Sequence, residues 1–230
     1  MKVLAIQLLD YKEWTESLGT DREWIIQKTQ HEFMKEIHKI AASYNAFPLQ
    51  LRYDNFIILV DGISKNDIIS LTRSIREHLP VEIKTCLGYG ETPLDAQSKA
   101  SECLNRNVVE PLKEYKDELL AALHFDINHN TKSLKHTTIY DSFLEITQTY
   151  LHIAKILYEY GGIVQYLGGD NYLGFISSDD VPKFVNEFKD DRLKLGIGIA
   201  KNARKAIKLA TDALEEIRAN RENRWYIKRE

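Results

Sequence analysis

LGGDNYL, at residues 167–173, is a polar turn set inside an apolar hairpin, and the chain carries a second turn of the same kind, LRYDNFI, at residues 51–57. An apolar run that ends in an aspartate precedes each turn: Val3–Asp10 precedes the first and Leu123–Asp126 the second. The distance between the paired aspartates is the same in both cases, since 54 − 10 = 44 and 170 − 126 = 44. Unequal insertions would have destroyed this spacing, so we interpret the chain as a duplicated unit.

Both halves predict the same order of elements around these turns. In the first half, apolar residues recur with helical period over 25–44, after a capping box at Thr20–Glu23. In the second half, the same pattern runs from a second helix start at Thr138 to a glycine stop at Gly161. After each hairpin we expect a second helix (66–78 and 181–189), a strand (81–87 and 193–199) and a last helix, which begins at Thr92 or near Asn202.

The order β-α-β-β-α-β followed by a terminal helix is the split βαβ, or ferredoxin-like, arrangement. We therefore predict an α+β fold of two tandem ferredoxin-like units, with mainly antiparallel sheets and helices on one face. Residues 107–117 are charged and contain a proline, so we place the domains at 1–112 and 113–230. The charged tail from residue 219 onward carries Trp225, Tyr226 and Ile227, which allows it to dock as a short strand.

Composition excludes several classes of protein. With 230 residues, 43% of them apolar and 28% charged, the chain has an ordinary globular composition. The net charge of −3 argues against a nucleic-acid partner. No apolar stretch approaches the roughly 20 residues of a membrane helix, and the start lacks a secretory signal, so we expect a cytoplasmic protein. The two cysteines, Cys86 and Cys103, form no CxxC pair, and we expect two small, half-buried side chains.

The paired aspartates are the strongest chemical signal. In this fold the first strand lies beside the hairpin, so Asp126 and Asp170 are expected to point at one spot, and likewise Asp10 and Asp54. Two neighbouring carboxylates repel each other unless a proton or a cation lies between them, and Mg²⁺ prefers one or two carboxylates with waters and phosphate oxygens. The alternative is that the hairpin aspartates merely suit turns. Because glycine allows close backbone approach to a ligand, Gly168 and Gly169 make the second half the better metal site.

The polar loop after Asp126 is a candidate phosphate cradle. Its backbone N–H groups could bind phosphate oxygens as other anion-binding loops do. A polar loop before a helix is also commonplace, so an ordinary connection remains the alternative. The residues concerned are Asn128, His129, Asn130 and Thr131.

At these residues the second half resembles the GGDEF and class III nucleotidyl cyclase palm domains, in FDIN (125–128), LGGDN (167–171) and GIGIA (196–200). The resemblance implies that Asp126, the backbone carbonyl of Ile127 and Asp170 hold Mg²⁺. It places Arg218 where diguanylate cyclases carry a phosphate-binding lysine. The chain departs from that pattern in having Asn171 for a glutamate and Leu134 for a guanine-reading asparagine.

Nearly the whole chain resembles archaeal GTP cyclohydrolase III, through the tandem arrangement, YDN (53–55), GETPLDAQ (90–97), DIN (126–128), GGDN (168–171) and GIGI (196–199). That family implies Mg²⁺-dependent hydrolysis of GTP, with opening of the imidazole ring and release of phosphate. The implied product is 2-amino-5-formylamino-6-(5-phosphoribosylamino)pyrimidin-4(3H)-one, an intermediate toward riboflavin and deazaflavin cofactors. The alternatives are a nucleotidyl cyclase and a GTP-binding sensor without catalysis.

The remaining roles are assigned as hypotheses. His129 could transfer protons during ring opening, against the alternative of a solvated loop histidine. Asp10, Asp54 and Asn55 could form a second metal site or bind the guanine edge. An open palm sheet tends to need a partner, so we expect a homo-oligomer, a dimer or a tetramer. The predicted phosphate or nucleotide contacts are Asn128, Asn130, Thr131, Asn171, Lys201 and Arg218.

Overall fold

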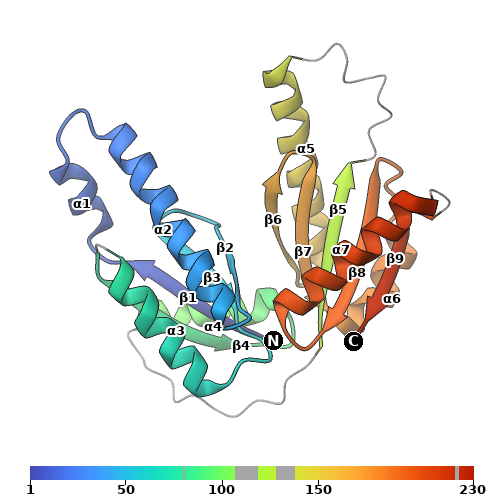
Figure 1. Ribbon diagram of the computed structural model, residues 1–230, viewed down its shortest axis with the longest axis horizontal. Helices are drawn as coiled ribbons and strands as arrows, with labels where there is room; N and C mark the ends of the chain where they lie inside the picture. The colour runs from blue at the N-terminus through green and yellow to red at the C-terminus, as the bar shows by residue number, and fades with distance from the viewer. Residues whose placement is uncertain (80, 107–118, 128–137, 221–222) are drawn as a thin grey trace. The chain divides into compact units, whose positions relative to one another are not determined.

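The computed structural model of the chain describes residues 1–79, 81–106, 119–127, 138–220 and 223–230 (Figure 1). The chain divides into two compact units. One comprises the described residues of Lys2–Gly90 and Asp95–Asp117, and the other those of Glu118–Glu230 with Met1 and Glu91–Leu94. The predicted domain boundary between residues 112 and 113 lies outside the described residues and stays a prediction.

The N-terminal unit is built on a four-stranded antiparallel sheet of order β2-β3-β1-β4. Its central strand, β1, is buried along almost its whole length because strands pair with it on both edges and helices cover the sheet. The elements of this unit are β1 (Lys2–Leu8), α1 (Tyr11–Ser17), α2 (Glu23–Ser43), β2 (Phe47–Leu49), β3 (Asn55–Leu59), α3 (Lys65–His78), β4 (Ile83–Tyr89) and α4 (Pro93–Arg106).

The C-terminal unit repeats this plan with a sheet of order β6-β7-β5-β8-β9. The extra strand is the C-terminal segment, which pairs parallel with β8, so the predicted docking of the tail is confirmed. The elements are β5 (Leu120–Ile127), α5 (Ile139–Glu159), β6 (Ile163–Gly168), β7 (Asn171–Ser177), the 3-10 turn η2 (Ser178–Asp180), α6 (Val181–Glu187), β8 (Leu193–Ala200), α7 (Ala203–Asn220) and β9 (Trp225–Arg229). Two tandem ferredoxin-like units with mainly antiparallel sheets are therefore confirmed.

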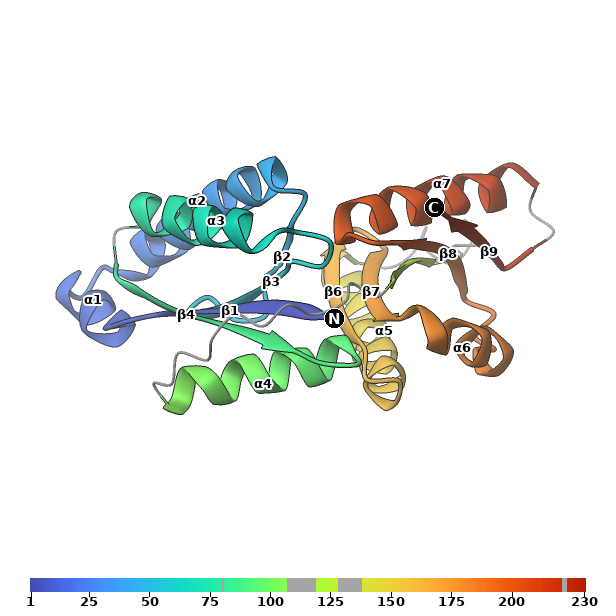
Figure 2. The same cartoon turned by 90° about the horizontal axis from the view of Figure 1, so that it is seen from below.

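Helices cover both faces of each sheet, which corrects the expectation that they would share one face. In the C-terminal unit, α7 lies on the face opposite α5 and α6, and in the N-terminal unit α4 lies opposite α2 and α3 (Figure 2). The strand sequence explains this placement. Glycines at 196 and 198 open one face of β8, where a side chain would collide with the backbone of α7 at Ala210 and Ala206. The alternate residues of the same strand fill the core on the other face.

The helix starts follow the sequence signals in part. At α5, Thr138 accepts a hydrogen bond from the Asp141 N–H (3.1 Å) and the Asp141 carboxylate accepts from the Thr138 N–H (3.2 Å), so this start is a capping box. The predicted capping box at Thr20–Glu23 is wrong, because α2 begins at Glu23 with Arg22 as its N-cap and no side-chain bond.

The cysteines also differ from expectation. Cys86 on β4 and Cys103 on α4 are joined in a disulfide, with their Cα atoms 6.0 Å apart. Gly88 allows this approach, because α4 lies directly against the backbone of β4 there, and a 6.0 Å separation lies within the range that a disulfide spans.

Candidate active site at the end of the central strand

Asp126 lies near the C-terminal end of β5, the central strand of the C-terminal unit. In the two ladders its Cα is paired with Asn171 on β7 and with Lys194 on β8. The residue is only 7% exposed, and a carboxylate with so little contact with water requires a cationic or hydrogen-bonding partner.

Arg218 on α7 supplies that partner. Its Nη2 and Nε donate to Asp126 Oδ2 at 3.0 and 3.3 Å, while its Nη1 donates to Glu215 Oε1 at 2.7 Å. Desolvation acts to lower the pKa of Arg218, but the hydrogen bonds and charges of Asp126 and Glu215 outweigh it and raise the pKa overall. The guanidinium is therefore a permanent positive charge beside the buried carboxylate. The resemblance to diguanylate cyclases predicts that this residue binds phosphate.

The glycine turn brings Asp170 next to this strand end. Gly168 and Gly169 adopt positive φ angles of 116° and 60°, which side chains other than glycine rarely adopt. The Asp170 carbonyl accepts a hydrogen bond from the Ile127 N–H at 3.2 Å, so the residue that follows Asp126 is tied to the turn. The Asp170 carboxylate accepts from the side-chain amide of Asn171 at 2.7 Å.

A histidine that the sequence reasoning left without a role completes the cluster. His124 Nε2 lies 3.1 Å from Asn171 Oδ1, and its Nδ1 lies 3.3 Å from the Thr211 hydroxyl. Burial lowers the pKa of His124 and outweighs the hydrogen bond to Asn171, which acts to raise it. The lowered pKa favours the neutral ring. Because alternate strand residues share a face, the position of His124 two residues before Asp126 indicates from the sequence that the two side chains lie on the same face of the strand.

The oxygen donors near this strand end are of the type that Mg²⁺ prefers. The chain offers the Asp126 and Asp170 carboxylates and the Ile127 carbonyl, all hard oxygen donors of the type Mg²⁺ prefers. The described residues contain no group of three or more His, Cys, Asp or Glu side chains able to hold a metal.

One predicted site residue lies away from this strand end, and others lie outside the described residues. The β5–β8 register pairs Asp126 with Lys194 and Leu120 with Ala200. Lys201 therefore follows the opposite end of β8, about 23 Å along the strand from Lys194 at about 3.3 Å per residue, and does not join this cluster. Its backbone N–H instead donates to Glu230 at 3.4 Å. The loop residues Asn128, His129, Asn130 and Thr131 lie outside the described residues.

The first half does not repeat the aspartate pair, although the spacing predicted it. The Leu8 N–H donates to the Asp54 carbonyl at 2.9 Å, as Ile127 does to Asp170, and Gln7 pairs with Asn55 as Asp126 does with Asn171. Gln7 therefore occupies the place of Asp126. The equal spacing of 44 residues suggested that Asp10 corresponds to Asp126, but the segments between the first strand and the long helix differ in length. This segment has 14 residues (9–22) in the first half and 11 (128–138) in the second, a difference of 14 − 11 = 3.

Asp10 and Asp54 have other surroundings in the N-terminal unit. Asp10 lies two residues beyond β1, as the N-cap of α1 with a left-handed φ of 50°. Asp54 accepts two hydrogen bonds from Arg52, at 2.7 and 3.0 Å. The second metal or guanine site of Asp10, Asp54 and Asn55 stays a prediction.

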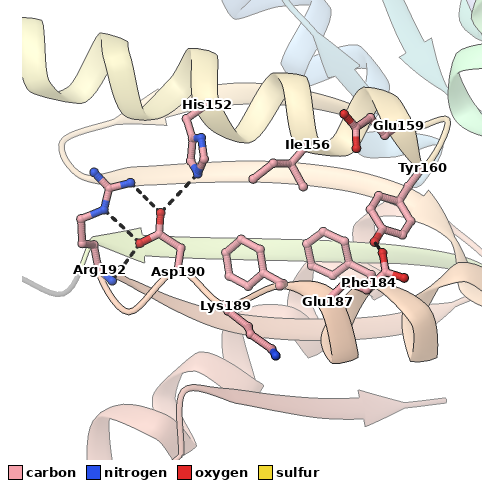
Figure 3. A pocket seen from close by; sticks show the side chains of 10 residues that line it. His152, Ile156, Glu159, Tyr160, Phe184, Glu187, Lys189, Asp190 and Arg192 are labelled. Atoms are coloured by element: carbon pink, nitrogen blue, oxygen red, sulfur yellow. Dashed lines mark hydrogen bonds and ion pairs between the residues drawn. The ribbon is translucent and has the colours of Figure 1, made fainter.

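A separate cavity of about 540 Å³ lies between α5, α6 and the loop before β8 (Figure 3). Asp190 anchors one end: Arg192 donates to it at 2.6 and 2.9 Å, and His152 Nε2 lies 3.4 Å away. The hydrogen bond from Arg192 is the main cause that lowers the pKa of Asp190. Its carboxylate is thus occupied by protein groups, and the cavity does not include Asp126 or Asp170. The lining residues are His152, Ile156, Glu159, Tyr160, Phe184, Glu187, Phe188, Lys189, Asp190 and Arg192.

Fold and site together define a tandem palm-type protein, with one unit that carries two acids and an arginine at the end of its central strand. The family model of GTP cyclohydrolase III matches residues 3–230. The GTP cyclohydrolase III of Saccharolobus solfataricus is 59% identical over 100% of both chains, and that of Sulfurisphaera tokodaii is 41% identical over 99% of this chain and 98% of its own. The chain therefore belongs to the GTP cyclohydrolase III family and is an enzyme.

Solved structures offer more distant likenesses. A bacterial light-regulated adenylyl cyclase matches at a TM-score of 0.36 with 12% identity, over 99% of this chain and 85% of its own. An EAL/GGDEF domain protein from M. capsulatus matches at a TM-score of 0.35 with 16% identity, over 50% of this chain and 87% of its own. No helix among the described residues is long and apolar enough to cross a membrane.

Proposed function

We propose that the chain hydrolyses GTP with Mg²⁺ as cofactor and forms 2-amino-5-formylamino-6-(5-phosphoribosylamino)pyrimidin-4(3H)-one and two inorganic phosphates. One water adds its oxygen to C8 of guanine, the C8–N9 bond breaks, and N9 takes a proton, so the formyl group stays on the former N7. Two further waters cleave the phosphoanhydrides. Membership of the family over the full length of the chain supports GTP as substrate.

The observation that carries the Mg²⁺ assignment is the buried Asp126 tied through Ile127 to the Asp170 turn. Asp126, Asp170 and the Ile127 carbonyl would hold the ion, which when bound would neutralise the triphosphate and acidify a coordinated water. Arg218, already held beside Asp126, is placed to bind a phosphate oxygen. Asn171 would keep Asp170 oriented through its 2.7 Å hydrogen bond.

The proton-transfer group belongs to the same proposal. We assign it to His129, two residues after Ile127, because histidine titrates near neutral pH. Its structural context lies outside the described residues, so sequence position alone supports the assignment.

Incubation of the purified protein with GTP and Mg²⁺ tests the proposal. We expect loss of guanine absorbance, two phosphates released per GTP and a product mass that corresponds to the ring-opened monophosphate. Release of pyrophosphate with a cyclic or dinucleotide product would instead indicate a cyclase, and bound but unchanged GTP would indicate a sensor.

A further inference from the structure

A series of hydrogen bonds connects α7 to the Asp170 turn by way of His124. The Thr211 hydroxyl on α7 lies 3.3 Å from His124 Nδ1, and His124 Nε2 on β5 lies 3.1 Å from Asn171 Oδ1. The Asn171 side-chain amide then donates to Asp170 Oδ1 at 2.7 Å. Four side chains thus form one continuous series, and it ends at a carboxylate that the proposed function assigns to Mg²⁺.

The donor and the acceptor of each hydrogen bond in this series follow from the chemistry of the groups. The ionised Asp170 carboxylate can only accept, so the Asn171 nitrogen faces it and the Asn171 oxygen faces His124. That oxygen can also only accept, so the proton of the neutral imidazole lies on Nε2, and Nδ1 accepts from the Thr211 hydroxyl. Every hydrogen bond of the series is therefore donated in the direction of Asp170.

The N-terminal unit contains the same turn without the histidine. Ala5 stands at the ladder position equivalent to that of His124. The turn has the same dipeptide, Asp54 and Asn55. The Asp54 carboxylate accepts from Arg52 at 2.7 and 3.0 Å, and among the described residues the Asn55 side chain makes no hydrogen bond to it. In the described part of the chain, the contact between the two turn side chains thus occurs only in the unit that has the histidine.

We propose that His124 is a positioning residue for Mg²⁺ binding, an inference that rests on the proposed assignment of Asp170 as a metal ligand. By donating from Nε2, His124 keeps the Asn171 amide turned so that its nitrogen faces Asp170. The amide in turn fixes the rotation of the carboxylate. A ligand that is already fixed loses less conformational freedom when the ion binds, so the site binds the ion more tightly.

The variants His124→Leu and His124→Gln test this role. Leucine cannot donate to Asn171, whereas the nitrogen of a glutamine amide can take the place of Nε2 and donate. We expect His124→Leu to raise the Mg²⁺ concentration for half-maximal GTP turnover about tenfold. Turnover at saturating Mg²⁺ should fall by no more than about twofold, because the histidine does not act on the reacting atoms.

The conservative variant and a control complete this experiment. His124→Gln should stay within about twofold of the wild-type Mg²⁺ dependence, because it keeps the hydrogen bond. The control His78→Leu, at an exposed histidine of the N-terminal unit, should match wild type. His124→Leu should also add nothing in an Asn171→Ala background, since the histidine acts through that amide.

The outcomes separate this role from the proposed function. Wild-type turnover without any divalent ion would overturn the metal site and the role of His124 together. Wild-type dependence on Mg²⁺ with an unchanged His124→Leu variant would overturn the role of His124 alone. The role would also be overturned if His124→Gln were as impaired as His124→Leu, or if turnover fell while the Mg²⁺ dependence stayed the same.

Nitrogen-15 spectra of histidine-labelled wild type test the direction of the series without any turnover. The His124 signals, identified by their loss in His124→Gln, should show a protonated Nε2 and an unprotonated Nδ1. The opposite tautomer would mean that Asn171 presents its nitrogen to the ring and its oxygen to Asp170. That result would overturn the proposal even if His124→Leu proved too unstable to assay.

Discussion

Asp126→Asn should separate catalysis from folding. The substitution keeps the shape of the side chain and removes its charge, so the oxygen that accepts from Arg218 is retained while the anionic ligand is lost. The N-terminal unit shows that the fold accepts an amide here, since Gln7 occupies the equivalent ladder position.

The expected loss of stability is small. The Arg218 side chain is 41% exposed and also binds Glu215, so it can relax toward solvent when Asp126 loses its charge. Partly exposed ion pairs contribute roughly 0–1 kcal/mol, and we expect the free energy of unfolding to change by no more than about 1 kcal/mol. Turnover should fall at least about 100-fold, equivalent to about 2.7 kcal/mol in the activation barrier.

The two quantities are measured on the same preparations, by urea denaturation and by phosphate release from GTP with Mg²⁺. Asp212→Asn, at an exposed acid on the same helix as Arg218, is the matched control and should change neither. A fully active Asp126→Asn enzyme would refute the metal-site reasoning. A loss of several kcal/mol in stability would show instead that Asp126 has a structural role.

Three further predictions concern stability. Cys86→Ser/Cys103→Ser should lower the unfolding free energy by about 3 kcal/mol, because the disulfide closes a loop with a sequence separation of 17. The difference in unfolding free energy between variant and wild type should vanish under reducing conditions. A difference that persists there would contradict the loop-closure reasoning. The pKa of Asp190 is lowered in the folded state, so the ionised carboxylate stabilises the fold by about 1 kcal/mol. This stabilisation is present above the unfolded pKa of about 4 and is lost as the pH falls through the lower pKa of the folded state. Urea titrations at pH 5 and pH 3 should therefore show a smaller loss for Asp190→Asn than for wild type or Asp212→Asn, and equal losses would count against the Asp190–Arg192 contact. Gly169→Ala should cost about 1 kcal/mol because its φ is +60°, seen as a fall of about 2–4 °C in thermal midpoint, whereas an unchanged midpoint would mean that the turn readjusts.

The sequence predicted the fold well because periodicity and turn chemistry reflect local physics. The long helices, both hairpins and the docked tail follow from apolar spacing and glycine positions. The sequence prediction put the terminal helices on the wrong face of the sheet. The glycines of β8 indicate the correct face, because a helix can lie close to a strand where the strand carries no side chains. The disulfide could not be foreseen from two cysteines 17 residues apart.

The positions of the predicted site residues differ from the sequence expectation in places, and these differences have one cause. Asp126, Asp170 and Arg218 were singled out, and the structure places all three at one end of β5 and β7. Lys201 lies at the opposite end of β8 and His124 lies beside Asn171, and neither placement was expected, because sequence spacing does not show which end or which face of a strand a residue occupies. Asp10 does not correspond to Asp126 for the same reason. The spacing along the sequence does not show at which residue two strands begin to pair.

The close contact between α7 and β8 has a consequence for how this enzyme can be altered. No side chain separates helix from strand at Gly196 and Gly198, so backbone atoms set the distance from Arg218 to the acid it faces. Mutant libraries that resize apolar residues beneath the sheet should leave that distance unchanged. Substitution of either glycine should instead push the whole helix outward and withdraw the guanidinium.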